Sequence, residues 1–266
     1  MHAWITTDRG SLALAEVPEP EPGPDEAVIS VEAFSPNRGE TFVLEQAMPG
    51  FMPGKDIAGV VIESAASGQG PRVGEKVVAH LEHSGWAERA AVSVDRLAVI
   101  PEGVDTVRAA ALPLAGLTAL RLIRTTGSLA SRRVLLTGAS GGVGHYVVEL
   151  AAAQGAQITV VAANEERSRR LLALGASSWV SDPEQATGSF DVGMDSVGGG
   201  STATVLRKLT DRGFLVWFGQ ASRRAPTLDF FDWTGGSSAT IRKFLYTDDD
   251  TPVADDLASL VRLGRC

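Results

Sequence analysis

The order of apolar and polar positions in the first hundred residues predicts a β-rich domain. Short alternating or apolar runs are separated by proline and glycine, as is typical of strands. The runs are AVISVEAF (27–34), DIAGVVIES (56–64), KVVAHLE (76–82) and ERAAVSVDRLAVIP (88–101). The acidic stretch PEPEPGPDE (18–26) cannot form a regular helix, because each proline removes an N–H donor and constrains the residue before it. We therefore expect residues 1–105 to form a compact β domain.

After residue 105 the pattern changes to helical spacing and then to alternating strands and helices. The stretch 109–127 is rich in alanine and leucine, and Pro113 and Gly116 predict a break between two helical segments. The following segments alternate as βαβ units: 158–163, 165–176, 177–182, 190–198, 201–209 and 213–219. Such units form a parallel sheet with helices on both faces, so residues 106–242 are predicted to be a doubly wound α/β domain. The stretch 221–239 is predicted to be a long irregular connection and a candidate cover for a ligand.

The segment VLLTGASGGVGHYVVELAAAQG (134–155) predicts a dinucleotide site. An unbroken apolar strand, 134–136, precedes a glycine-rich turn and a helix that starts near Gly142. Gly141 allows a pyrophosphate to approach the backbone, Gly144 allows the helix to pack closely on the strand, and the helix N-terminus offers unpaired N–H groups. Ala139 replaces the first glycine of the usual motif, and an ordinary strand-to-helix loop is the alternative interpretation. The predicted phosphate-binding residues are Ser140, Gly141, Gly142, Val143 and Gly144.

The end of the next strand favours NADPH over NADH. In NAD-binding folds an acidic residue about 20 positions after the glycine turn binds the adenosine ribose. Here the strand ends in VVAAN, with Asn164 as its last residue, and Arg167 follows. A 2′-phosphate would therefore meet the Arg167 cation, and it would not meet the carboxylate that NAD-binding folds have at the strand end. Glu165 and Glu166 weaken this argument, because they lie in the same segment, although acidic residues also suit the first turn of a helix.

Composition and charge exclude several other classes of protein. The chain of 266 residues is 44% hydrophobic and 21% charged, as in ordinary globular proteins, and its net charge of −8 disfavours nucleic acid and anionic membranes. No apolar stretch reaches the roughly 18 residues of a membrane span, and the N-terminus lacks a secretory pattern, so we expect a cytoplasmic protein. The single cysteine, Cys266, excludes an internal disulfide and a cysteine zinc cluster, and the four histidines lack metal-ligand spacing.

The succession of motifs along the chain resembles the medium-chain dehydrogenase/reductases. The motifs are GPDEAVISVEA, PNRGE, MPGKDIAGVV, RVGEKVVA, AALPLAGLTAL, TGASGGVG, LLALGA, FDVGMDSVGG and GFLVWFG, and the resemblance runs from Met1 to about Gly264. Within that superfamily the chain is similar to the zinc-independent quinone oxidoreductases, such as zeta-crystallin. Gly54, Lys55 and Asp56 stand where zinc-dependent relatives have glycine, histidine and glutamate, so no catalytic zinc is expected.

The resemblance implies a fold and an activity. The fold is a GroES-like, β-rich substrate domain followed by a Rossmann domain, with an active site in the cleft between them. The activity is hydride transfer from NADPH to a quinone or an α,β-unsaturated carbonyl, and the usual assembly is a homodimer. Alternatives are a reductase of another enoyl or carbonyl substrate in specialised metabolism, or an NADPH-binding sensor or structural protein without turnover.

The resemblance also assigns residues to the site. It implies that Asn37 and Thr118 lie beside the nicotinamide, with a loop residue and an ordinary helix residue as the alternatives. It implies that Arg167 binds the 2′-phosphate, and that two groups at strand ends, or in plain turns, face the cofactor: Ser196, Val197 and Gly198, and Phe218, Gly219 and Gln220.

Several positions depart from the family pattern. Glu40 stands where many relatives have aspartate, and Asp182 stands where many have a tyrosine that helps to hold the 2′-phosphate. No side chain is assigned as the proton donor, because Tyr146 and Tyr246 are poorly placed. Water or the cofactor's ribose hydroxyl is as plausible a proton source as any side chain. Relatives continue past the glycine that matches Gly264. Residues 243–266 are therefore expected to begin a return to the substrate domain and to be truncated.

Overall fold

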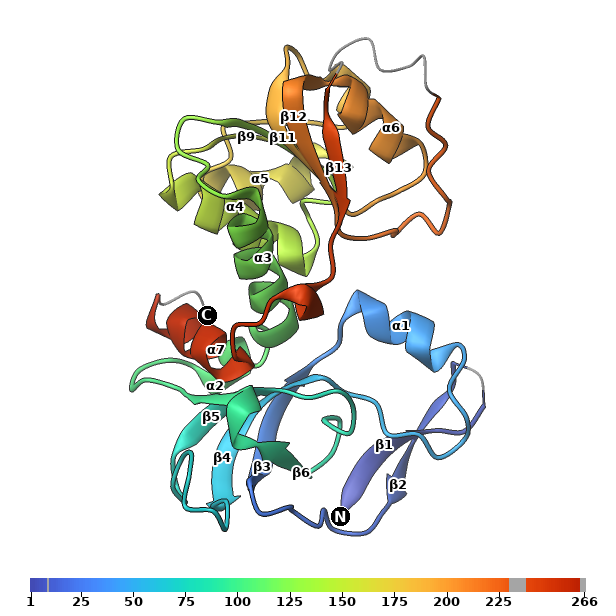
Figure 1. The fold of residues 1–266 in the computed structure, drawn as a ribbon. Helices are drawn as coiled ribbons and strands as arrows, with labels where there is room; N and C mark the ends of the chain where they lie inside the picture. The colour runs from blue at the N-terminus through green and yellow to red at the C-terminus, as the bar shows by residue number, and fades with distance from the viewer. Residues whose placement is uncertain (9, 230–237, 264–266) are drawn as a thin grey trace. The chain divides into compact units, whose positions relative to one another are not determined.

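The computed structural model describes residues 1–8, 10–229 and 238–263, which belong to two compact units (Figure 1). Unit 1 comprises Met1–Leu117 and Asp250–Cys266, and unit 2 comprises Thr118–Asp249. The divisions differ from the predicted boundaries at 105 and 242. Helix α2 (Thr106–Ala109) packs against three strands of the unit 1 sheet, so the helical texture that begins there does not mark the change of unit.

Unit 1 is built on a five-stranded antiparallel sheet with the order β6-β3-β4-β5-β7. The strands are β3 (Glu26–Ser35), β4 (Asp56–Glu63), β5 (Lys76–His80), β6 (Arg89–Ser93) and β7 (Leu97–Val99). Alternate apolar residues point into one core, where Ile29, Ile57 and Val77 are fully buried. The run predicted at 88–101 is divided by a 3-10 turn, Val94–Arg96, into β6 and β7. The strand pattern of the first hundred residues therefore forms the expected β-rich unit.

Four further elements complete unit 1, and the sequence pattern did not single them out. Strands β1 (His2–Thr6) and β2 (Leu12–Glu16) form a separate antiparallel pair. Helix α1 (Arg38–Leu44) follows β3. Helix α7 (Val253–Arg262) packs against β5 and β7, with Leu257 and Leu260 fully buried.

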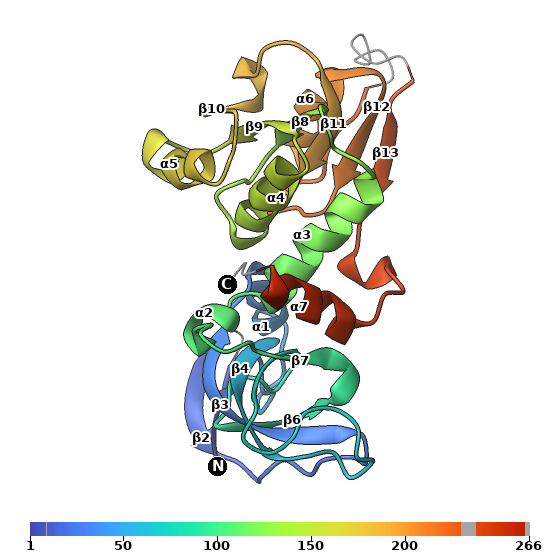
Figure 2. The same cartoon turned by 90° about the vertical axis from the view of Figure 1, so that its left-hand side faces the viewer.

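Unit 2 is built on a six-stranded sheet in which every neighbouring pair is parallel, with the order β10-β9-β8-β11-β12-β13 (Figure 2). The strands are β8 (Arg133–Leu136), β9 (Gln157–Val161), β10 (Ser178–Val180), β11 (Phe190–Asp195), β12 (Leu209–Trp217) and β13 (Thr240–Lys243). The chain moves from β8 to β9 and β10 on one side, and then to β11 on the other. This reversal is a topological switch point, where ligands of open α/β sheets bind.

Helices cover both faces of the parallel sheet, as the βαβ pattern predicted. One core joins α3 (Pro113–Thr126), α4 (Gly142–Ala153) and α5 (Glu165–Ala173) to the face that carries Val134 and Leu136. A second core joins α6 (Gly200–Arg207) to the opposite face, which carries Leu135. All three of these β8 residues are fully buried, so the unbroken apolar run reflects a central strand.

The structure bears on two predictions about irregular segments. Helix α3 begins at Pro113, where a missing N–H costs nothing, but Gly116 lies inside it and does not break it. Of the predicted connection 221–239, residues 230–237 lie outside the described residues. A 3-10 turn, Tyr246–Asp248, ends unit 2. Over the described part of the chain, we found no helix with the length and apolarity needed to cross a membrane.

Candidate active site

The glycine turn leaves the carboxyl end of β8 and is held against the end of β11. The backbone N–H of Thr137 donates to the carbonyl of Met194 over 3.0 Å. Gly138 has a φ of +61°, and a Cβ there would lie 2.2 Å from Ser196 Oγ. Only glycine satisfies both requirements. The turn and the loop after β11 therefore form one packed structure.

Two glycines of the turn have different physical roles. A Cβ on Gly144 would lie 2.2 Å from the carbonyl oxygen of Ala139 and 2.6 Å from its carbonyl carbon, so α4 can approach the turn this closely only with glycine. A Cβ on Gly141 would meet only Gly138 O at 3.4 Å, and Gly141 is exposed. Gly141 is the N-cap of α4 and has no side chain in front of the first helical N–H groups. This end of the helix is therefore open to an anion.

The other strand-end residues lie beside the turn, at the carboxyl ends of neighbouring strands. Ser196, Val197 and Gly198 directly follow β11, and Phe218, Gly219 and Gln220 directly follow β12. The two loops are joined by backbone hydrogen bonds, from Phe218 N to Asp195 O and from Ala221 N to Ser196 O, each 2.9 Å long. A Cβ on Gly219 would lie 2.9 Å from Ser196 O. All these residues belong to one edge of the sheet, as their sequence positions predicted.

The segment after β9 carries an exposed arginine at the start of α5. Asn164 is the N-cap of this helix, and its side chain accepts a hydrogen bond from Arg167 N over 3.0 Å. Asn164 therefore orders the turn that carries Arg167. Arg169 pairs with Glu165 at 3.8 Å, whereas no ion pair to the Arg167 guanidinium is found among the residues that the structure describes. Arg167 is thus an available cation of this segment, and Arg170 in the same helix is a second one.

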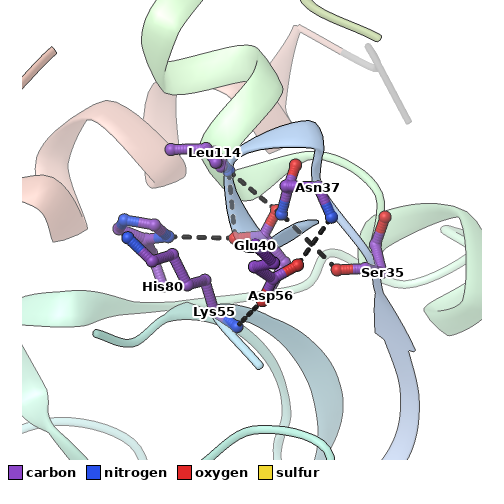
Figure 3. A network of polar contacts seen from close by, with 7 residues as sticks. All are labelled: Ser35, Asn37, Glu40, Lys55, Asp56, His80 and Leu114. Carbon is purple, nitrogen blue, oxygen red and sulfur yellow. Dashed lines mark hydrogen bonds and ion pairs between the residues drawn. The ribbon is translucent and has the colours of Figure 1, made fainter. Parts of the chain in front are cut away.

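Unit 1 contains a buried polar network around Asp56 (Figure 3). Asp56 and His80 are 0% and 1% exposed, and His80 Nδ1 lies 2.9 Å from Asp56 Oδ1. Asn37 Nδ2 donates to Asp56 Oδ2 over 2.9 Å, and Leu114 N donates to both oxygens over 3.1 and 3.2 Å. Asp56 therefore connects the ends of β4 and β5 with the residue before α1 and with the first turn of α3.

The network fixes the orientation of the Asn37 amide. Nδ2 must face the Asp56 carboxylate, because the opposite orientation would place two acceptors against each other. The Asn37 side chain also takes part in a capping box with Glu40 at the start of α1. The Asn37 amide is therefore held in one orientation by residues of unit 1. The sequence predicted Asn37 as a site residue but contained no signal for its connection to His80, which lies 43 positions away.

Glu40 binds the backbone of the same turn. Its Oε2 accepts from Asn37 N over 2.6 Å and its Oε1 accepts from Lys55 N over 2.9 Å. Burial raises the pKa of Glu40, and the nearby Asp56 charge raises it further, while the two backbone donors oppose this shift. Glu40 thus holds the loop in place.

The remaining predicted residues are placed as follows. Thr118 is a buried residue of α3, four positions after Leu114. Asp182 is the N-cap of a 3-10 turn, Pro183–Gln185, and its side chain accepts from Glu184 N over 2.8 Å. Tyr146 is a half-buried residue of α4 that packs against the core of unit 2. Among the described residues, no group of three or more His, Cys, Asp or Glu side chains could hold a metal ion.

The arrangement in unit 2 fits a dinucleotide. The open helix N-terminus behind Gly141 lies at the switch point between β8 and β11, with the exposed Arg167 on the β9 side and two ordered loops on the β11 side. A pyrophosphate needs such N–H groups, and a ribose phosphate needs such a cation. The fold and this site define an α/β protein of the dinucleotide-binding class.

Comparisons with known proteins agree with this class. Residues 142–260 match the family model described as zinc-binding dehydrogenase. The chain is 37% identical over 179 residues to a chloroplast envelope quinone oxidoreductase homolog of Arabidopsis thaliana, covering 60% of this chain and 54% of that protein. It is 29% identical over 224 residues to an NADPH-dependent alkenal/one oxidoreductase of the same plant, covering 74% and 58%. The chain therefore spans a little over half the length of these curated relatives.

The fold is also that of a solved quinone oxidoreductase. The structure of the Escherichia coli enzyme complexed with NADPH matches with a TM-score of 0.87 and 21% identity, over 99% of this chain and 89% of that one. The chain is thus similar in fold to quinone oxidoreductases over nearly its whole length, and similar in sequence to quinone oxidoreductase homologues over part of it. The predicted fold class, a β-rich domain with a Rossmann-type parallel sheet, is confirmed, and these similarities agree with the predicted family.

Proposed function

We propose that the protein is a zinc-independent, NADPH-dependent reductase of quinones or α,β-unsaturated carbonyls. The observation that carries this proposal is the open N-terminus of α4 behind Gly141, together with Arg167 in the first turn of α5, for which the described residues provide no ion pair. The similarity to proteins named as a quinone oxidoreductase homolog and an NADPH-dependent alkenal/one oxidoreductase supports the substrate class.

Each part of the proposed site has a chemical role. NADPH, when bound, supplies a hydride to the electron-poor acceptor. The first N–H groups of α4 bind the pyrophosphate, and Arg167 binds the 2′-phosphate. The family resemblance implies that Asn37 lies beside the nicotinamide. The proton that completes the two-electron reduction comes from water or from a ribose hydroxyl, because no side-chain acid is assigned.

Turnover is tested by mixing the protein with NADPH and a panel of acceptors: 1,4-naphthoquinone, 9,10-phenanthrenequinone and simple enones. We expect loss of reduced-cofactor absorbance with at least one acceptor, at a rate on the order of 10 per second. Tight binding of NADPH, with no oxidation of NADPH by any acceptor, would indicate a binding protein without turnover and would contradict the enzyme proposal.

The choice of cofactor depends on Arg167. We expect Arg167→Ala to raise the dissociation constant of NADPH roughly 10- to 100-fold, because a charge-assisted contact contributes about 1.5–3 kcal/mol. The dissociation constant of NADH should change less than about twofold, since NADH has no 2′-phosphate.

The matched control for this measurement is Arg169→Ala, which removes the same charge from the same helix but from a residue that pairs with Glu165. Isothermal titration of both variants with both nucleotides provides the comparison. Equal weakening of NADPH and NADH by Arg167→Ala would refute the assignment.

Two finer features stay predictions. The family resemblance implies a homodimer, and the sequence favours the cytoplasm, whereas the Arabidopsis relatives are named as proteins of the chloroplast. A sedimentation measurement with and without NADPH would give the assembly state.

A further inference from the structure

The last residue of β11 is a buried carboxylate that is saturated with hydrogen bonds. Asp195 is 0% exposed. Its Oδ1 accepts from Thr137 Oγ1 at 2.5 Å, Ser201 Oγ at 2.8 Å and Val197 N at 3.3 Å. Its Oδ2 accepts from Thr202 Oγ1 at 2.6 Å and Gly198 N at 3.1 Å. Burial of a carboxylate is costly unless donors surround it, and here five donors do so.

These five donors come from three separate segments at one edge of the sheet. Thr137 begins the glycine turn after β8, Val197 and Gly198 form the loop after β11, and Ser201 and Thr202 lie in the first turn of α6. Further bonds connect the same segments: Ser196 N donates to Thr137 Oγ1 over 3.3 Å, and Ser196 Oγ donates to Thr137 O over 3.2 Å. Asp195 is therefore the common partner that determines how the loop lies against the turn.

The order of strands indicates which half of a dinucleotide this loop serves. The pyrophosphate position at α4 lies after β8, and Arg167 lies on the β9 side of it. If Arg167 binds the 2′-phosphate, the adenosine half extends toward β9. The nicotinamide half then extends in the other direction, over the loops after β11 and β12. Asp195 lies under the first of these loops and cannot itself touch a ligand, because it is fully buried.

We propose that Asp195 is a positioning residue for the nicotinamide half of the cofactor. It orders residues 196–198 against the glycine turn, and it leaves the adenosine half unaffected. This role rests on the proposed NADPH binding. A neutral asparagine cannot replace the carboxylate, since its amide N–H groups would face the N–H of Gly198 or Val197, and a backbone donor cannot rotate away.

The test compares two ligands that share the adenosine half. Binding of NADPH and of adenosine 2′,5′-bisphosphate, which lacks the nicotinamide, is measured by isothermal titration for wild type and Asp195→Asn. We expect the dissociation constant of NADPH to rise about tenfold or more, and that of the bisphosphate to change less than about twofold. A loss of general fold integrity would weaken both ligands together, so the ratio of the two constants isolates the positioning role.

Asp191→Asn is the matched control, because Asp191 lies on the same strand at the opposite end and accepts from Arg133 N over 2.9 Å. For Asp191→Asn, the ratio of the NADPH dissociation constant to the bisphosphate dissociation constant should equal that of wild type. If Asp195→Asn does not fold, Thr137→Val removes one of the same bonds and should raise the ratio in the same direction. Equal weakening of both ligands, or no weakening, overturns the proposal. A wild-type protein that binds neither ligand contradicts the proposed function as well.

Discussion

Replacing Asp56 by alanine is expected to lower the free energy of unfolding of unit 1 by about 3–5 kcal/mol, the usual cost of removing one partner from a buried charged contact. Both carboxylate oxygens are buried, and the substitution removes the partner of His80 Nδ1, the acceptor of Leu114 N and the shorter of the two hydrogen bonds of Asn37 Nδ2. Chemical denaturation followed by circular dichroism measures the change.

Two variants sharpen this measurement. Asp56→Asn retains the size of the side chain and one acceptor, so its loss should be smaller than that of Asp56→Ala. Asp95→Ala removes an exposed carboxylate from the same unit and should change stability by less than about 0.5 kcal/mol. A loss below about 1 kcal/mol for Asp56→Ala would show that the network does not hold the ends of β4, β5 and α3 together.

Adding a single methyl group at Gly144 is expected to destabilise unit 2 by about 3 kcal/mol or more. The new Cβ in Gly144→Ala would lie 2.2–2.6 Å from three backbone atoms of Ala139, so α4 itself must move, and overpacking against the backbone cannot be relieved by a rotamer change. The displaced helix would also lose its position behind the phosphate. Thermal unfolding and NADPH titration of the same sample record both effects.

The same substitution at Gly141 provides the contrast. Gly141 has a φ of −80°, which alanine adopts freely, and its Cβ would meet only Gly138 O at 3.4 Å. Gly141→Ala should therefore cost about 1 kcal/mol or less in stability, while the methyl group in front of α4 weakens NADPH binding. Similar losses of stability for the two variants would contradict the separate roles of these glycines.

Local sequence signals predicted the secondary structure around the proposed cofactor site. The apolar run 134–136 and the glycines after it indicated a central strand, a tight turn and a helix, and each of these is formed within a few consecutive residues. Asn164 and Arg167 were predicted by their distance from the turn, and the residues after β11 and β12 by their place at strand ends. Nearness in the chain sufficed, because parallel strands bring their carboxyl ends to one edge.

Other features depended on contacts between distant residues. Asp195 and Asp56 resemble ordinary acidic residues in the sequence, and nothing near them identifies their partners. The strand β13 was not predicted, because its four residues, TIRK, have no continuous apolar pattern and gain their place by pairing with β12. Helix α2 lies where the sequence changes to helical spacing, but it packs in unit 1. Tertiary contacts, and not composition, decide which unit a helix joins.

The sequence by itself determined the two kinds of sheet and the glycine turn with its helix, because these depend on patterns with a period of a few residues. The tertiary structure alone decided the polarity of the site. It fixed the orientation of the Asn37 amide by placing Asp56 against its nitrogen, and it gathered five donors from three segments around Asp195. Hydrogen-bond direction is set by which groups meet after folding, and the partners here lie up to 58 positions apart.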